Sequence, residues 1–351
     1  MVELRIFGCP KSLLNGPCGG AFNGKCEVNE NHCPWLGVLE RVHYLDGAVL
    51  FNEHPILMEI GKIPSRDVKP KNSNFWSQVE KGRALSVEFP IAAVKNEEDV
   101  AKIVSQITPE LYTIPDNPLG YPHFSPTAFA THLKHFGIEV MPHLTAKDRN
   151  LTALTAELKT AVLFNFEVVL LATGDWPSLA LPSRPVFDLD STNMIRLARF
   201  VFNGVLPTKE TFEVKERPRV AGAMNPHYKP RVEAQRIARK LMAGAELFFT
   251  QVVATKESVT RIKETFIELK KYINAEVPVM VSLLYPISDD IKPLLRRMGI
   301  QTGDDTFEEV LEEVKALDVA GGVNLIILSR NLDVWLSLWR EAYEKIKEVL
   351  R

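Results

Sequence analysis

This 351-residue chain lacks a large charge excess, long apolar runs and a recognisable secretory leader. Its 42 basic and 44 acidic residues give a formal charge of −2, too small for a general field that draws in nucleic acid or an anionic membrane. No uninterrupted apolar run reaches the roughly 20 residues that a membrane-spanning helix needs. The N-terminus shows no long apolar segment followed by a small-residue cleavage site. We therefore expect a cytoplasmic protein that binds neither nucleic acid nor membrane.

Cysteine is also scarce, and every cysteine lies within the first 33 residues: Cys9, Cys18, Cys26 and Cys33. Free cysteine normally occurs scattered as a small buried apolar residue, so this grouping indicates a chemical role. Glycine and proline fill the spacers between the cysteines, and together they allow a tight, stiff wrap around a compact object. Four thiolates can complete a tetrahedral zinc site or hold an iron–sulfur cluster.

The sequence leaves the choice between these two groups open. Structural zinc sites usually contain Cys-x-x-Cys pairs, and none occurs here, so the even spacing favours a [4Fe–4S] cluster over zinc. The spacing also differs from that of bacterial ferredoxins. Two disulfides or four unliganded thiols are the remaining alternatives, and a reducing compartment disfavours disulfides. The metal site could be purely structural, whereas a cluster could also pass electrons.

Beyond a polar stretch at 61–74, short apolar runs alternate with amphipathic segments, such as 255–273 and 332–350. Such runs are typical of buried parallel strands. The eight predicted strands are 84–90, 111–114, 138–144, 167–172, 219–224, 246–252, 277–284 and 322–328. Eight strand–helix repeats predict a (β/α)8 barrel over residues 83–351, after a small cysteine-rich domain over 1–82 that includes a short helix at 35–45. A doubly wound open sheet is the alternative.

Barrel enzymes carry their active sites at the C-terminal ends of the strands. The proton-transfer candidates there are Glu88, His143 and Asp175, and Gln251 is an isolated amide in an apolar strand. Burial would raise the pKa of Glu88 and keep it protonated, as a general acid requires. Alternatively, Glu88 pairs with a lysine inside the barrel, His143 hydrogen-bonds within its loop and Asp175 caps a helix. No P-loop, GxGxxG at a strand end, HExxH or nucleophile elbow is present.

Several short motifs at these strand ends occur together in one known family. They are SVEFP (86–90), DNP (116–118), PHLTAKDRNL (142–151), TGD (173–175), VFDLDS (186–191), AGAMNP (221–226) and AGAELFFTQVV (243–253). In this order they resemble the methylenetetrahydrofolate reductase family. The NGPCGG and CPW elements of the first 82 residues resemble the cysteine-rich domain that accompanies such reductases in archaea and acetogenic bacteria.

The resemblance implies a flavin-bearing barrel that reduces 5,10-methylene-tetrahydropterin to the 5-methyl form in one-carbon and methionine metabolism. It implies that Glu88 protonates the bridging amine, that Asp175 tunes the charge of both rings and that Gln251 binds the pterin. The implied cofactor-binding residues are Asn117, His143, Thr173, Gly174, Asp175 and Lys240, with Lys240 at the flavin phosphate. Thr173 stands where many members carry arginine, so FMN is as compatible as FAD.

The resemblance leaves the pterin open between tetrahydrofolate and an archaeal analogue. A cluster on the same chain would point to ferredoxin or a redox partner subunit as the electron donor, and an oligomer is expected. Two other functions stay open. One is a flavin-free, pterin-binding methyl-transfer barrel. The other is a non-catalytic partner subunit with a structural zinc module.

Overall fold

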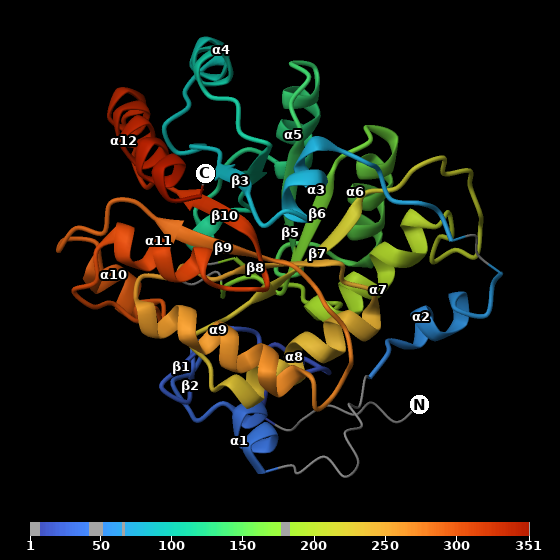
Figure 1. The fold of residues 1–351 in the computed structure, drawn as a ribbon. Coiled ribbons are helices and arrows are strands. Elements are labelled where there is room, and N and C mark those ends of the chain that lie inside the picture. Colours follow the sequence, from blue (N-terminus) through green and yellow to red (C-terminus); the bar gives the residue numbers. More distant parts are fainter. Residues whose placement is uncertain (1–7, 42–51, 65–66, 177–182, 351) are drawn as a thin grey trace.

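The computed structural model describes residues 8–41, 52–64, 67–176 and 183–350. Eight parallel strands close into a barrel in the order β10-β3-β4-β5-β6-β7-β8-β9, with helices around it (Figure 1). The strands are β3 (Ala84–Glu88), β4 (Leu111–Ile114), β5 (Val140–Thr145), β6 (Val168–Ala172), β7 (Arg219–Met224), β8 (Leu247–Thr250), β9 (Val279–Leu284) and β10 (Ala320–Ile326). All eight overlap the predicted strands, so the predicted (β/α)8 barrel is confirmed.

The helices of the barrel bury the apolar faces that their sequences predict. They are α4 (Glu97–Gln106), α5 (Pro126–Lys134), α6 (Leu151–Leu163), α7 (Ser191–Phe202), α8 (Pro230–Ala243), α9 (Lys256–Leu269), α10 (Lys292–Arg297), α11 (Phe307–Lys315) and α12 (Leu332–Leu350). In α9, Val259, Ile262 and Phe266 recur at helical spacing and are buried. No helix in the described part of the chain is both long and apolar enough to cross a bilayer.

The interior of the barrel is layered, because alternate residues of each strand point inward. The layer farthest from the C-terminal ends of the strands, called the lowest layer below, is apolar. It includes Ala84, Leu111, Met141, Val168, Leu247 and Met280. Above it lies a polar layer, where Ser86 donates to Oδ1 of Asn324 at 2.8 Å and Asn324 donates to Ser282 at 3.2 Å. Glu88 follows Ser86 by two residues on β3, so its side chain faces the open, C-terminal end of the barrel.

Helix α3 (Asn74–Val79) closes the opposite end of the barrel, where Phe75 and Val79 pack against the lowest apolar layer. We expect Phe75→Ala to lower the free energy of unfolding by about 3–5 kcal/mol, because Phe75 is fully buried and its removal leaves a cavity. Urea denaturation measures the effect. Phe22→Ala is the matched control, since Phe22 is 42% exposed and should cost under about 1 kcal/mol. Equal costs in the two variants would contradict this packing.

The remaining N-terminal elements lie against the outside of the barrel. Strands β1 (Ala21–Phe22) and β2 (Lys25–Cys26) form a small hairpin, and α1 (Pro34–Arg41) contacts α8 (Figure 1). Helix α2 (Pro55–Ile60) packs on α7. The helix predicted at 35–45 corresponds to α1, and residues 42–45 lie outside the described part. The domain boundary near residue 82 stays a prediction, although α3 on its N-terminal side packs into the barrel.

Candidate functional site

Glu88 is a carboxyl group without a described partner at the open end of the barrel. It ends β3, is partly buried, and receives no hydrogen bond or ion pair from the residues that the structure describes. Burial raises its pKa from 4.5 to about 7, with no neighbouring charge contributing. The alternative of a lysine partner inside the barrel therefore finds no support. At neutral pH a large fraction of Glu88 holds a proton that it can donate.

His143 on β5 lies on the inner face, two residues from Met141 of the lowest layer. Its Nε2 is buried and has no hydrogen-bond partner in the described part of the chain. Burial lowers its pKa to about 4, against a smaller opposing effect of Asp116. His143 is therefore neutral at pH 7, and its orphaned ring nitrogen needs a partner that a bound ligand would supply.

Asp116, at the end of β4, organises the loops beside His143. Its carboxylate accepts hydrogen bonds from the backbone N–H and hydroxyl of Thr145, at 2.9 and 2.6 Å, and pairs with the guanidinium of Arg149. Asn117 follows with a left-handed backbone at φ +44°, and its Oδ1 accepts from the backbone N–H of His123 at 2.8 Å. Asn117 thus shapes the loop after β4, and any contact with a cofactor remains a prediction.

Asp175 lies in the loop after β6, where several loops meet. The side chain has exposed surface, yet dense surrounding protein raises its pKa, and Glu27 raises it further. Lys11, Lys147 and the backbone N–H of Leu119 oppose this rise. The next described helix, α7, is capped by Asp190 and not by Asp175. Asp175 therefore joins the loops after β4, β5 and β6 at the mouth of the barrel.

Gly174 is tightly enclosed next to Asp175. Its φ is +86°, and a Cβ added there would lie 2.9 Å from Cβ of Thr145 and 3.1 Å from side-chain carbons of Lys147. The neighbouring Thr173 is buried. Only glycine fits this position without strain.

We expect Gly174→Ala to destabilise the protein by about 1–3 kcal/mol more than Gly137→Ala. Gly137 is a matched control because its φ is +75° and nothing lies within 4 Å of an added Cβ. Both variants carry the backbone strain, and only Gly174→Ala adds the clash. Thermal or urea unfolding measures the difference, and equal losses would show that the loop accommodates a methyl group.

Gln251 and Lys240 differ in where they point. Gln251 follows β8 and is partly buried, and its Oε1 accepts from the backbone N–H of Val252 at 3.0 Å. Its Nε2 has no acceptor among the described residues. Lys240 is buried between α8 and β7, donates to the carbonyl of Ala223, and has its pKa lowered by burial to about 7. The structure therefore does not bring Lys240 to the mouth, where Glu88 and His143 lie.

All four cysteines line one small cavity, together with Lys11 and Trp35. As they stand, they do not form a ready metal site, because no three His, Cys, Asp or Glu side chains in the described part of the chain are placed to hold a metal ion. Burial raises the pKa of Cys18 to about 11, so its thiol is protonated at pH 7. A metal would have to displace that proton on binding.

The cysteine segment (residues 8–35) is fastened to the same end of the barrel as Asp175. Lys11 Nζ donates to the carbonyl of Gly174 at 2.9 Å. Three further hydrogen bonds join residues of this segment to the end of β7 and to α8: Asn225 Nδ2 to Gly19 O at 3.3 Å, Ala21 N to Tyr228 OH at 3.2 Å and Arg236 Nε to Pro17 O at 3.1 Å. The cysteine cavity is therefore adjacent to the loop that carries Asp175.

Comparison with known families decides the assignment. Residues 80–289, more than half of the chain, match the family model described as methylenetetrahydrofolate reductase. The chain belongs to the methylenetetrahydrofolate reductase family. Residues 5–56 match a second family model, described as methylene-tetrahydrofolate reductase C terminal, although they lie at the N-terminus here. No curated protein matches the chain.

One solved structure supports the fold of this reductase-family chain. An uncharacterized protein from Clostridium thermocellum, which binds two copies of 5-methyl-5,6,7,8-tetrahydrofolic acid, is 14% identical with a TM-score of 0.54. That match covers 77% of this chain and 99% of the other. A 2,3-dimethylmalate lyase is 11% identical with a TM-score of 0.46, over 80% of this chain and 89% of the other. At 14% identity the likeness to the Clostridium thermocellum protein concerns the fold alone, and the lyase, with a TM-score of only 0.46, carries no argument.

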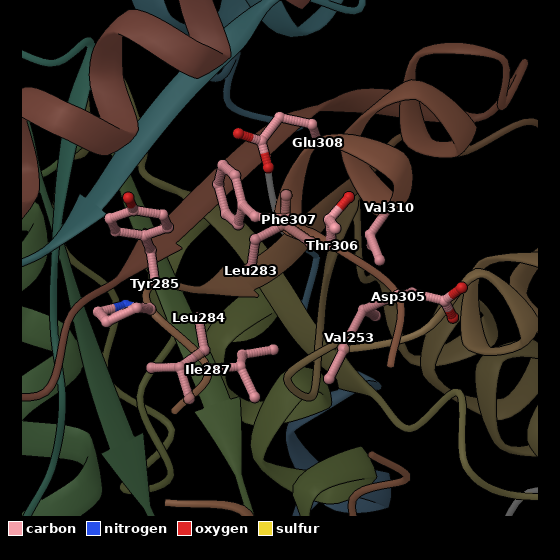
Figure 2. A pocket seen from close by; sticks show the side chains of 12 residues that line it. Val253, Leu283, Leu284, Tyr285, Ile287, Asp305, Thr306, Phe307, Glu308 and Val310 are labelled. Atoms are coloured by element: carbon pink, nitrogen blue, oxygen red, sulfur yellow. The ribbon is translucent and has the colours of Figure 1, made fainter. Parts of the chain in front are cut away.

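A second cavity of this reductase-family barrel lies between the end of β9 and the start of α11 (Figure 2). Val253, Leu283 and Ile287 give it an apolar wall. Its polar side chains have partners within the protein, since Tyr285 OH donates to Glu341 at 3.3 Å and Asp305 accepts from the backbone N–H of Lys256 at 3.0 Å. None of the residues predicted to act in catalysis or to bind substrate, cofactor or metal lines it, so we assign it no role.

Sequence reasoning missed two features of the site. Asp116 enters the sequence analysis only as part of the DNP motif (116–118), whereas its ion pair with Arg149 makes it an anchor for two loops. The DNP and KDRN motifs contain both residues and are the signal that could have linked them. Lys11 and Glu27, which contact the Asp175 loop, carry no signal in the sequence that distinguishes them from surface charges.

Proposed function

We propose that this protein reduces a 5,10-methylene-tetrahydropterin to the 5-methyl form with the help of a bound flavin. The observation that carries the proposal is the Glu88 carboxyl, which has no described partner, at the mouth of a methylenetetrahydrofolate reductase-family barrel. A protein of similar fold that binds a methylated tetrahydrofolate supports the pterin as ligand class. Tetrahydrofolate and an archaeal analogue both belong to this ligand class.

In the proposed reaction Glu88 donates its proton to the bridging nitrogen of the five-membered ring. The bond between that nitrogen and the methylene carbon breaks, and the carbon becomes electron-poor. The flavin, when bound, supplies the hydride that converts this carbon to a methyl group. Neutral His143 offers its orphaned Nε2 to a ring of cofactor or substrate, and Gln251 offers its free Nε2 hydrogens to the pterin. Asp175, whose loop lies at the same mouth, would tune the charge of both rings when they are bound.

The residues at the mouth fit a flavin in one testable respect, because the buried Nε2 of His143 lacks a partner that a flat heterocycle would provide. Thr173, Gly174 and Asn117 belong to the proposed cofactor contacts. The assignment of Lys240 to the flavin phosphate rests on the family resemblance alone, because its ammonium donates to the carbonyl of Ala223 inside the protein. FMN and FAD both remain compatible.

The four cysteines line one cavity beside this site, and four thiols are a donor set that zinc or an iron–sulfur cluster uses, although no three of them are placed to hold a metal ion in the described part of the chain. We propose that they hold a [4Fe–4S] cluster that delivers electrons from ferredoxin or a redox partner subunit. Zinc at the same thiols would make the segment structural.

Anaerobic titration tests the reductase function. Protein loaded with FMN or FAD and then reduced should be reoxidised by 5,10-methylene-tetrahydrofolate, with one methyl product formed for each flavin. Pterin binding without retained flavin or reoxidation would instead favour the methyl-transfer barrel. Neither binding nor reoxidation, with any tetrahydropterin, would favour the non-catalytic subunit.

A further inference from the structure

Lys11 lies between the cysteine cavity and the Asp175 loop. It lines the cavity, and its side chain is only 2% exposed. Its ammonium pairs with the carboxylate of Glu27 and donates to the carbonyl of Gly174 at 2.9 Å. It also lies 5.1 Å from the centre of the Phe187 ring. One buried cation therefore contacts the cavity wall and the loop at the barrel mouth together.

Glu27 completes the connection from the other side. One carboxylate oxygen accepts from the backbone N–H of Trp176 at 3.4 Å, and the other lies 3.6 Å from Sγ of Cys18. The Trp176 ring stacks on Phe187, with 6.0 Å between ring centres. The carbonyl of Gly174 and the N–H of Trp176 flank Asp175 in sequence, so a single ion pair holds the backbone on both sides of Asp175.

We propose that Lys11 and Glu27 are positioning residues that fix the loop 173–176, and with it Asp175, according to what the cysteine cavity holds. A metal group that takes Cys18 as a ligand ends the contact between its thiol and Glu27. Glu27 and Lys11 then transmit the change to the two backbone groups beside Asp175. The inference deepens the proposed function, because it assigns the cysteine segment an effect on the pterin site.

The Lys11–Glu27 pair is not what holds the cysteine segment to the barrel. Asp190 accepts from the backbone N–H of Leu14 at 3.1 Å and from Nδ2 of Asn15 at 3.0 Å. Arg236, Asn225 and Tyr228 supply the other attachments described above. Lys11→Met should therefore leave the segment docked and loosen only the loop 173–176.

Hydrogen–deuterium exchange of full-length protein tests this inference. In Lys11→Met and Glu27→Gln, exchange of the loop 173–176 should accelerate about tenfold or more, because a charge-assisted contact of the buried Lys11 ammonium is lost. Lys25→Met is the matched control: Lys25 is exposed in the same segment, and its removal should leave the exchange unchanged. Unchanged loop exchange in both test variants would overturn the positioning role.

The link to the cavity is tested with Zn²⁺ as the probe. Loading the four thiols of the unaltered protein should change the exchange rate of the loop 173–176, and Lys11→Met should abolish that response at equal zinc content. A response that persists in Lys11→Met, or no zinc response in the unaltered protein, would overturn the link. Failure of the proposed function is separate, since it shows as no reoxidation of reduced flavin by a 5,10-methylene-tetrahydropterin in the unaltered protein, whatever the exchange rates are.

Discussion

Glu88→Gln should lower turnover by about 10²–10⁴-fold while pterin binding is retained, because the amide keeps the shape of the side chain and cannot donate a proton to the bridging nitrogen. Steady-state rates and equilibrium binding of 5-methyltetrahydrofolate measure the two effects separately. Glu216→Gln is the control, since Glu216 is exposed and lies outside the site. Unchanged turnover in Glu88→Gln would exclude Glu88 as the acid.

The same substitution should stabilise the protein at pH 8. The pKa of Glu88 is raised from 4.5 to about 7 in the folded protein, so between these values the folded state binds more protons than the unfolded state. Stability therefore falls as the pH rises through this window, and Glu88→Gln removes the loss. The difference in free energy of unfolding should be about 3 kcal/mol at pH 8 and near zero below pH 4. If the Glu88 carboxylate instead stabilised the fold through an ion pair, Glu88→Gln would lower the free energy of unfolding at pH 8.

Replacing any one of the four cysteines by serine should remove the proposed metal group from the protein. A group held by four ligands in one cavity loses geometry and charge when a single thiolate is lost, and structural zinc binding alone is worth on the order of 10 kcal/mol. Iron, zinc and sulfide content of anaerobically prepared protein measure the effect. Glu30→Gln, an exposed change in the same segment, should keep the full content.

The electron donor then separates a cluster from zinc. With a cluster, Cys18→Ser should lose reduction by ferredoxin and keep reduction of the flavin by dithionite. With zinc, the rate of flavin reduction by ferredoxin should be the same in Cys18→Ser and in the unaltered protein, and so should the rate of reduction by dithionite. Full metal content in all four cysteine variants would contradict the assignment of these thiols as ligands.

The sequence predicts the barrel well because buried parallel strands are continuous apolar runs, which the alternating helices separate. Strands β4 and β7 and helix α12 have the predicted bounds. The positions of Glu88, His143 and Asp175 at strand ends follow from the same strand assignments, since barrel topology brings these ends together.

Side-chain direction and docking could not be predicted in this way. Lys240 lies on a helix next to the right strand, yet its ammonium turns toward a carbonyl inside the protein. Lys11 contacts Gly174, which lies 163 residues later in the sequence. Lys11 belongs to the cysteine segment, which has little regular secondary structure. Such contacts depend on how the cysteine segment packs on the barrel, and no local pattern records that packing.

The most direct test of the central claim is the pH dependence of a single turnover, in which protein with reduced flavin is mixed anaerobically with a 5,10-methylene-tetrahydropterin. If Glu88 supplies the proton, the rate should be constant at low pH and should fall about tenfold per pH unit above about pH 7. The same profile in Glu88→Gln should be slow and flat. A rate in the unaltered protein that does not change between pH 6 and 9 would contradict proton donation by Glu88.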